Sequence, residues 1–407
     1  MTGSVPQPDR DTLLAVARQV AGTPSAALGE WQITPIGGSA THVNAWRVSG
    51  SLLDGPRRRA FSVVLKRRDG APETDTEAQA YQSGLLDRLR AQPFGLIAPR
   101  CFGVGQPSAG VVWLWLEDVS EPPGARWSIE RYGLASYHLG RFNGAHPDDE
   151  VREFLEDPAR AQQVPAYPWL GRGFLPDWLG FLEAEGIGDA IVGVRPEDRR
   201  AWEHPLVRRA FSPPTCERLR WVWHERDRLL AALNRLPRTL AHGDAHRRNL
   251  LTRAAPAAPL APNALSGDLT VGVDWDTIGL APLGEDAGHL VSSSQLMDVD
   301  PGRARALDRA VFEGYLQGLR DAGWRIDRRT RDLIRFGYAL HAPLNMGVFA
   351  GGGLVSALSQ PWLRQWLEEL LGRPLEAAAE PLAALARFTL DLADEAQSLG
   401  RALGHLD

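Results

Sequence analysis

Leu240–Thr252 has the sequence LAHGDAHRRNLLT, and Leu269–Asp276 has the sequence LTVGVDWD. Both stretches join short apolar runs, of the kind that form buried strands, to polar residues that can do chemistry. Asp244 and Asn249 lie in an expected loop between two short strands, and Asp274 directly follows the apolar run of the second stretch. This order of carboxylate, carboxamide and second carboxylate is the basis for interpreting the rest of the chain.

These residue types suit phosphoryl transfer. One carboxylate can orient an acceptor hydroxyl and take its proton, while the other oxygen-bearing groups hold Mg²⁺ against nucleotide phosphates. Each piece alone is common, because Asp after Gly is usual in turns and Asn in a loop often caps or adopts left-handed dihedrals. The ordered combination of HGD, an Asn five residues after the Asp, a strand and a further Asp is far rarer by chance.

The combination resembles the catalytic and metal-binding segments of the aminoglycoside phosphotransferase and choline kinase family, which has the protein-kinase-like fold. The resemblance extends roughly from Gln32 to Val291, and more loosely to the helices beyond. It implies that Asp244 is the catalytic base. It also implies that Asn249 and Asp274 are magnesium ligands, and we expect Asp276, just past the strand end, to be a secondary one.

The same resemblance implies that His242 is a structural residue of the catalytic loop, and we expect Asp286 to anchor that loop. His242 and His246 have the i, i+4 spacing of some zinc sites. No third ligand type clusters near them, so zinc is not expected. Trp275 stands where protein kinases have the Phe of DFG, and small-molecule kinases of this family often have Trp there.

Lys66 is the one lysine among 45 basic residues, the others being arginine. A lysine ammonium is a compact charge on a thin stem, which can contact phosphate in a narrow site without the planar fork of a guanidinium. A chance surface lysine is the alternative. The position of Lys66 at the end of an expected strand, FSVVLK, favours a role in nucleotide binding.

Lys66 ends the third of three expected strands, and a glycine turn separates the first two. Gly37, Gly38 and Ser39 would let backbone amides approach phosphate oxygens closely, although a plain hairpin turn is an alternative. The arrangement resembles a kinase-like nucleotide lobe, and no P-loop GK[ST] sequence occurs. The expected segments are a helix at Asp11–Val20, strands at Trp31–Ile36, Val43–Val48 and Phe61–Lys66, and a turn-rich connection at Ser51–Arg59.

Thr76–Leu89 is predicted to form one helix, with Glu77 on or beside its apolar face. An unpaired carboxylate there would be costly, so Glu77 is expected to pair with Lys66 and hold it toward the phosphates. Two alternatives are Glu73 as the partner, or a solvated Glu77 that interacts favourably with the helix dipole.

Val111–Leu116 is a dense apolar strand that continues into Glu117-Asp118-Val119. In the family this segment links the two lobes, and the resemblance implies that main-chain groups of Glu117 and Val119 bind the adenine edge. We therefore expect an α+β fold of the protein-kinase-like type. A small lobe at 1–116, with an antiparallel sheet and one main helix, would bind nucleotide, and a larger, mostly helical lobe at 117–407 would hold the catalytic and acceptor sites.

The segment 151–238 carries five tryptophans with acidic residues between them. Two interpretations are open: a helical core, or a variable acceptor-binding subdomain whose aromatic faces stack on sugar rings or cationic groups. Beyond residue 300 four or five helices are expected. Gly351–Gly353 would then be a flexible helix–helix connection or an acceptor-site loop.

Composition excludes several classes. The 407 residues carry a formal net charge of −5 and contain two cysteines, which does not fit a nucleic-acid-binding protein or a disulfide framework. No apolar run of about 18 residues occurs, and the N-terminal 20 residues do not resemble a secretory signal. A cytoplasmic protein without membrane or nucleic-acid partners is expected, and its oligomeric state stays open.

The expected activity is transfer of the γ-phosphoryl group of ATP or GTP, with Mg²⁺, to a hydroxyl of a small acceptor. Candidates are aminoglycosides or other antibiotics, amino sugars, sugars, and choline-like or homoserine-like alcohols, and the negative net charge favours a cationic one. A protein kinase is an alternative, although HRD and DFG motifs are absent and no APE sequence follows Asp274. A non-catalytic pseudokinase is another, although it would normally have lost Lys66, Asp244 or Asp274.

Overall fold

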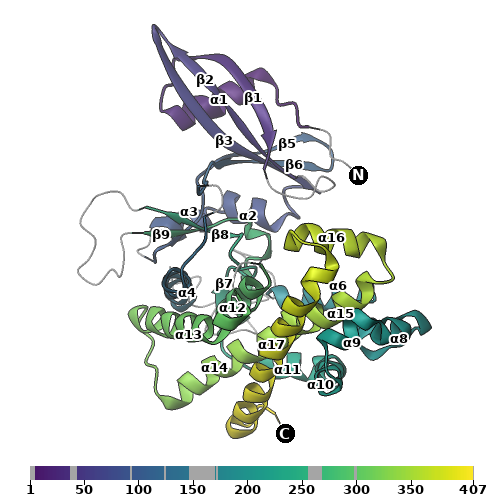
Figure 1. The fold of residues 1–407 in the computed structure, drawn as a ribbon. Helices are drawn as coiled ribbons and strands as arrows, with labels where there is room; N and C mark the ends of the chain where they lie inside the picture. Colours follow the sequence, from purple (N-terminus) through teal and green to yellow (C-terminus); the bar gives the residue numbers. More distant parts are fainter. Residues whose placement is uncertain are drawn as a thin grey trace.

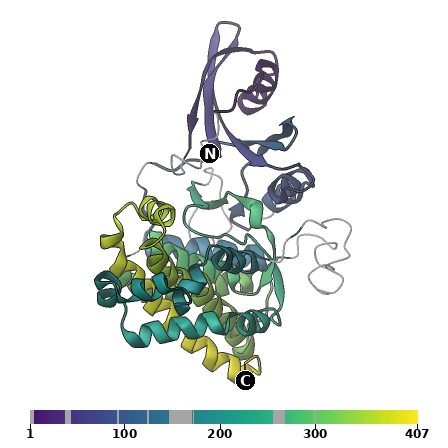
Figure 2. The same cartoon turned by 90° about the vertical axis from the view of Figure 1, so that its right-hand side faces the viewer.

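The protein consists of a small part built on a sheet and a larger, mostly helical part (Figure 1). The structure, a computed structural model, describes residues 5–36, 44–91, 94–122, 125–145, 170, 173–254, 268–297 and 300–406. The sheet stands at one end of the molecule in both views, with the helical part at the other end (Figure 2). The α+β prediction is confirmed. No helix in the described ranges is long and apolar enough to cross a membrane.

The small part contains a five-stranded antiparallel sheet in the order β1-β2-β3-β6-β5. A second, two-stranded sheet pairs β7 with β10, and a third has the order β4-β9-β8. The strands are β1 (Ala27–Pro35), β2 (Ala45–Asp54), β3 (Arg57–Asp69), β4 (Leu96–Ile97), β5 (Cys101–Ser108), β6 (Val111–Glu117), β7 (Arg238–Ala241), β8 (Leu250–Arg253), β9 (Leu269–Gly272) and β10 (Gly279–Pro282).

Helices dominate the chain after β6. The α-helices are α1 (Arg10–Ala21), α2 (Thr76–Gln82), α3 (Leu85–Ala91), α4 (Ile129–Gly144), α6 (Phe174–Ala184), α7 (Ile187–Val192), α8 (Pro196–Glu203), α9 (Pro205–Ala210), α10 (Pro213–His224), α11 (Arg226–Leu233), α12 (Glu285–Met297), α13 (Ala304–Asp321), α14 (Arg328–Ala342), α15 (Val348–Ala357), α16 (Pro361–Leu371) and α17 (Leu375–Leu403). Shorter helical turns are η2 (Trp275–Thr277), η3 (Pro301–Arg303) and η4 (Pro343–Gly347).

The predicted helix near the N-terminus is present as α1, and it covers one face of the five-stranded sheet (Figure 1). Leu13 and Val16 of α1 are buried in one apolar cluster with Val63 and Leu65 of β3. Successive side chains of a strand point to opposite faces, so Lys66 and Arg68 lie on the face of β3 away from α1. The apolar alternation of β3 thus decides which face Lys66 and Arg68 occupy.

Ser51–Arg59 is not the turn-rich connection that was expected. β2 and β3 pair from Ala45 with Lys66 to Asp54 with Arg57, so most of this stretch is strand. The turn itself lies at Gly55, which has a φ of 59°. The three consecutive arginines at the start of β3 have exposed side chains, while their backbone continues the ladder.

Two expected features of the helices were wrong. Thr76–Leu89 forms two helices, α2 and α3, because Gly84 between them has a left-handed φ of 73° that glycine adopts at little cost. Gly351–Gly353 is no connection but lies inside the buried helix α15. A Cβ atom on Gly352 would lie 2.5 Å from the carbonyl oxygen of Ile187 in α7, so this glycine allows the two helices to touch.

Candidate active site

The candidate catalytic loop runs from the end of β7 to the start of β8 and is held by buried hydrogen bonds. The backbone N–H groups of His242 and Gly243 each donate to the carboxylate of Asp286, at 2.9 Å. Asn143 of α4 donates to the same carboxylate at 2.9 Å and accepts from the hydroxyl of Tyr315 at 2.8 Å. The predicted anchoring role of Asp286 is confirmed, and the structure adds Asn143 and Tyr315 as supports.

His242 is a structural residue, as expected. Its ring is fully buried, and Nε2 lies 3.0 Å from the carbonyl oxygen of Val273. The ring also packs on Trp275, with centroids 4.4 Å apart. Burial lowers the pKa of His242, so the imidazole is neutral. The ring therefore connects the catalytic loop to the segment that follows β9.

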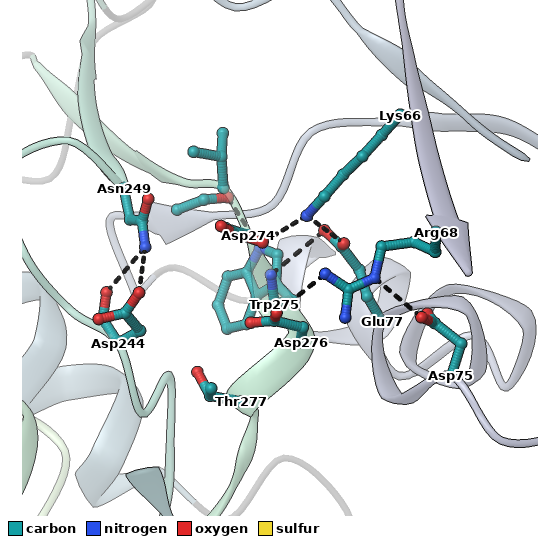
Figure 3. Close-up of polar contacts among 12 residues, drawn as sticks. Lys66, Arg68, Asp75, Glu77, Asp244, Asn249, Asp274, Trp275, Asp276 and Thr277 are labelled. Carbon is teal, nitrogen blue, oxygen red and sulfur yellow. Dashed lines mark hydrogen bonds and ion pairs between the residues drawn. The ribbon is translucent and has the colours of Figure 1, made fainter. Parts of the chain in front are cut away.

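Asp244 and Asn249 contact each other within this loop (Figure 3). Asn249 Nδ2 donates to Asp244 Oδ2 at 2.8 Å and to the Asp244 carbonyl oxygen at 3.1 Å. The amide nitrogen is thereby turned toward Asp244. The other end of the carboxamide, Oδ1, is left as the atom that could bind a cation.

Two histidines that sequence reasoning did not assign to the site also face Asp244. His246 Nε2 lies 3.4 Å from Asp244 Oδ2, and His289 Nε2 lies 3.0 Å from Asp244 Oδ1. Burial raises the pKa of Asp244, but the two histidines outweigh it and bring the pKa well below its usual value. The carboxylate is therefore ionised, and its side chain keeps 20% of its surface exposed.

Lys66 makes the predicted contact with Glu77. Its Nζ lies 2.5 Å from Glu77 Oε2, and the same nitrogen donates to Asp274 Oδ1 (Figure 3). Burial lowers the pKa of Lys66, but these two carboxylates outweigh it and raise the pKa above its usual value. Glu73, the alternative partner, is exposed. Lys66 thus joins the sheet, α2 and the segment after β9.

Arg68 is a second basic residue of this cluster and was not predicted. It lies two residues from Lys66 on the same face of β3. Its Nε donates to Asp75 at 2.9 Å, and its Nη1 donates to Asp276 at 3.0 Å. Asp75 also caps α2 by accepting from the N–H of Ala78 at 2.8 Å. Arg68 therefore holds the residue that caps α2, and it forms an ion pair with the carboxylate of Asp276.

Asp274 has an unusual backbone conformation, with a φ of 64° and a ψ of 63°. It is the one non-glycine residue with positive φ in the described ranges. Asp adopts this region more readily than most residues, yet such a conformation persists only where neighbouring contacts impose it. The N–H of Trp275 donates to Glu77 Oε1 at 3.2 Å, and the N–H of Val273 donates to the Asn249 carbonyl at 2.9 Å.

Carboxylates outnumber cations around the end of β3. Asp75, Glu77, Asp274 and Asp276 face Lys66 and Arg68. Burial raises the pKa of Asp276 to about 6, and the nearby charge of Asp274 adds to this effect. Burial likewise raises the pKa of Asp274, but Lys66 outweighs it, so that pKa lies below its usual value. The cluster is short of positive charge.

The expected adenine contacts of Glu117 and Val119 stay a prediction. The N–H of Glu117 donates to the Arg100 carbonyl at 2.8 Å, so this donor is used within the sheet. The Glu117 side chain pairs with Arg90 and Arg253. Val119 lies after β6, in the segment that leads toward α4. The glycine turn at 37–39 lies outside the described residues.

Of the tryptophans in the variable segment, Trp169 lies outside the described residues, and two others have different surroundings. Trp223 is buried in the helical core. Trp178 of α6 stacks between Phe174 and Phe181, with centroid distances of 5.6 and 5.4 Å. Phe174 in turn packs edge-on against His289, at 4.7 Å. A line of aromatic rings from α6 therefore reaches the histidine that contacts Asp244.

No family model matches the chain, and no curated protein sequence matches it. Several solved structures resemble it. An aminoglycoside phosphotransferase from Alicyclobacillus acidocaldarius is 15% identical, with 100% of both chains covered and a TM-score of 0.48. An amicoumacin kinase in complex with AMP-PNP, Ca²⁺ and Ami is 14% identical, with 90% of this chain and 97% of that chain covered and a TM-score of 0.46. A spectinomycin phosphotransferase in complex with ADP and spectinomycin is 13% identical, with 92% and 98% covered and a TM-score of 0.42.

Proposed function

We propose that the protein is a small-molecule kinase that transfers the γ-phosphoryl group of ATP or GTP to a hydroxyl group. One observation carries this proposal: a buried lysine–glutamate pair, Lys66 and Glu77, meets Asp274 beside the Asp244–Asn249 pair (Figure 3). A lysine held by a carboxylate is suited to bind phosphates. The second group supplies a base and an oxygen ligand, so the two halves of a phosphoryl-transfer site lie together.

Asp244 is the proposed base. Oδ1 accepts from His289 and retains a further lone pair for the acceptor hydroxyl. As the acceptor oxygen bonds to the γ-phosphorus, the bond from that phosphorus to the bridging oxygen breaks and the nucleoside diphosphate leaves. Asp244 takes the hydroxyl proton. Because its pKa lies well below the usual value, it accepts this proton only once the hydroxyl oxygen has become acidic through bonding to phosphorus.

Asn249 Oδ1 and the carboxylate of Asp274 fit a hard divalent cation such as Mg²⁺, which prefers oxygen ligands and keeps several waters. The excess of carboxylates around Lys66 and Arg68 supports this assignment. When bound, Mg²⁺ would neutralise phosphate charge. Asp276 is engaged by Arg68 at 3.0 Å and is therefore a secondary ligand in the proposal.

We place the acceptor beside Asp244, next to the aromatic side chains of α6. Phe174 contacts His289, and Phe181 at the other end of the stack is 36% exposed. Aromatic side chains can bind both flat apolar rings and cationic groups. Hydroxylated molecules with a ring or a cationic amine, such as aminoglycosides, amino sugars and amino alcohols, are therefore the first acceptors to test.

The test has two stages. Thermal shifts with MgATP and MgGTP identify the nucleotide, and mass spectrometry then seeks phosphorylated products from a panel of aminoglycosides, amino sugars, sugars and amino alcohols. Asp244→Asn is the control, expected to bind nucleotide without forming product. Nucleotide binding with no product from any acceptor would support a non-catalytic nucleotide-binding protein, and the lack of any nucleotide shift would contradict the proposal altogether.

A further inference from the structure

His289 reaches Asp244 from behind the catalytic loop. It lies on α12, is 1% exposed, and places Nε2 3.0 Å from Asp244 Oδ1. The other carboxylate oxygen, Oδ2, faces Asn249 and His246. The carboxylate is thus held on both oxygens, and His289 is the only contact of Oδ1 among the described residues. The direction of that hydrogen bond depends on which ring nitrogen of His289 carries the hydrogen.

The contacts of Asn345 indicate the position of this hydrogen. Asn345 lies in the π-helical turn η4, directly behind His289. Single π-helical turns within helices are frequent at functional sites. Asn345 Nδ2 lies 3.2 Å from both His289 Nδ1 and His341 Nε2. An amide nitrogen can only donate, so both ring nitrogens accept. The single hydrogen of a neutral His289 is therefore on Nε2, where it points at Asp244.

The opposite orientation of the Asn345 amide is disfavoured. Oδ1 of Asn345 is buried and has no hydrogen-bond partner in the described part of the chain. Exchanging the two ends of the amide would place an NH₂ group there, and buried N–H groups without acceptors are rarer than unpaired carbonyl oxygens. That exchange would also require an N–H at His289 Nδ1, and hence a second proton on the ring.

The groups beyond Asn345 carry no charge near neutral pH. His341 is fully buried, which lowers its pKa, and its Nδ1 lies 3.9 Å from Glu285 Oε2. Burial raises the pKa of Glu285 to about 8, with a further contribution from Asp286, so the Glu285 carboxyl keeps its proton. His341 and Glu285, on the side of His289 away from Asp244, are therefore uncharged.

We propose that His289 is a positioning residue of the reaction: its Nε2–H, fixed by Asn345, holds Oδ1 of Asp244 in place. The inference rests on the proposed function, in which Asp244 is the base. Because the Asn345 amide occupies Nδ1 of His289, the ring has no free lone pair. His289 therefore does not relay the proton, which stays on Asp244 until the product leaves.

The first test measures the hydrogen position and does not depend on activity. The full chain, which has 10 histidines, is labelled with ¹⁵N-histidine, and long-range ¹H–¹⁵N spectra assign each ring to a tautomer. The signal missing from His289→Gln identifies His289. We expect the Nε2–H tautomer in the wild type and a mixture of tautomers in Asn345→Leu. An imidazolium or an Nδ1–H tautomer at His289 in the wild type would overturn the inference.

The second test separates positioning from folding. His289→Phe should lower kcat by about 10- to 100-fold, the range of a lost hydrogen bond to a charged group, with the nucleotide KM unchanged. His289→Gln should recover most of kcat, because its side-chain N–H can take the place of Nε2–H. The rates are normalised to nucleotide-binding sites, so that loss of folded protein does not lower them.

His138→Gln is the matched control. His138 is also buried, but it contacts Thr270 Oγ1 at 3.0 Å and not Asp244. Its replacement should leave kcat within about two-fold. Equal losses for His289→Gln and His289→Phe, or a changed nucleotide KM in place of kcat, would contradict the positioning role. If the wild type phosphorylates no acceptor, the proposed function fails, and the tautomer measurement still decides the arrangement of His289.

Discussion

Asp244 is held at both carboxylate oxygens and is still reachable from solvent, a combination that suits a base. We expect Asp244→Asn to lower turnover by about 10²–10⁴, because a positioned proton acceptor contributes that much to the rate. Nucleotide affinity should be unchanged, since the proposed phosphate contact lies at Lys66. Steady-state kinetics and calorimetric titration with nucleotide check this. A variant that keeps more than roughly half its turnover would exclude Asp244 as the base.

Lys66→Arg should be almost as inactive as Lys66→Ala. The Lys66 ammonium contacts Glu77 and Asp274 at once, and a planar guanidinium would displace one of them. A misplacement of about 1 Å can cost on the order of 10²-fold in rate. Arg67→Ala is the control, because the Arg67 side chain is 31% exposed and pairs with exposed Asp69. Circular dichroism verifies folding, and near-wild-type turnover of Lys66→Arg would contradict the assignment.

The ordered motif predicted which residues would form the site, but not everything that supports them. Lys66, Glu77, Asp274 and the Asp244–Asn249 pair come together, although their roles stay predictions. Arg68 was missed even though the strand period of two places it on the same face as Lys66. Arginine is so common in this chain that one more arginine did not stand out as a site residue.

His289 was missed for a different reason. It lies three residues after Asp286, which puts both on one face of α12, and this spacing was visible in the sequence. Its contact with Asp244, however, depends on how α12 packs behind the catalytic loop. Spacing along the chain does not determine that packing. The sequence could therefore show that His289 shares a helix face with Asp286, but not that it contacts Asp244.

At the scale of helices, the contact between α7 and α15 is set by the absence of a side chain. Gly352→Ala should destabilise the protein by about 1–3 kcal/mol, because the new Cβ would meet backbone, the carbonyl oxygen of Ile187, at 2.5 Å. The apparent Tm, measured by calorimetry, should fall accordingly.

Gly180→Ala is the matched control for that variant. Gly180 lies inside α6, is exposed, and has nothing within 4 Å of an added Cβ. Alanine is favoured over glycine inside a helix, so this change should stabilise the protein by about 0.5–1 kcal/mol. If both variants shift Tm in the same direction, the close packing of α7 on α15 is not the reason why residue 352 is glycine.

Glycine also shows why element boundaries were harder to predict than element types. Gly84 does end α2, whereas Gly351–Gly353 continues a helix. The sequence signal is the same in both places, a glycine beside apolar residues. What differs is the surroundings, since α15 is buried against α7 and gains packing that offsets the low helix propensity of glycine. Tertiary contacts decided the outcome.

At the scale of the whole molecule, Glu285 should make stability depend on pH. The folded protein keeps the Glu285 proton up to about pH 8, whereas the carboxyl ionises near 4.5 when unperturbed. Between these values the folded state binds more protons than the unfolded chain, so the free energy of unfolding falls as pH rises. Glu285→Gln cannot ionise and should raise the apparent Tm much more at pH 8 than at pH 5.

The expected gain for Glu285→Gln at pH 8 is a few kcal/mol, because one pKa unit corresponds to about 1.4 kcal/mol. Glutamine keeps an oxygen to accept from the N–H of Phe174, which now donates to Glu285 Oε1 at 3.3 Å. Glu73→Gln, at an exposed position, should show no such pH dependence. A Glu285→Gln effect of equal size at both pH values would mean that Glu285 is ionised throughout.

Lys66 and Arg68 also have a mechanical consequence. From one strand of the sheet they reach Asp274 and Asp276, so these two ion pairs form a latch between the sheet and the segment after β9. We expect a stiff resting molecule, whose small-angle scattering radius changes little when MgATP is added, and an Arg68→Ala variant that expands. A wild type that contracts strongly with nucleotide would disprove the latch. If the latch holds, nucleotide binds by replacing these ion pairs with its own contacts, without a large closing motion of the two parts.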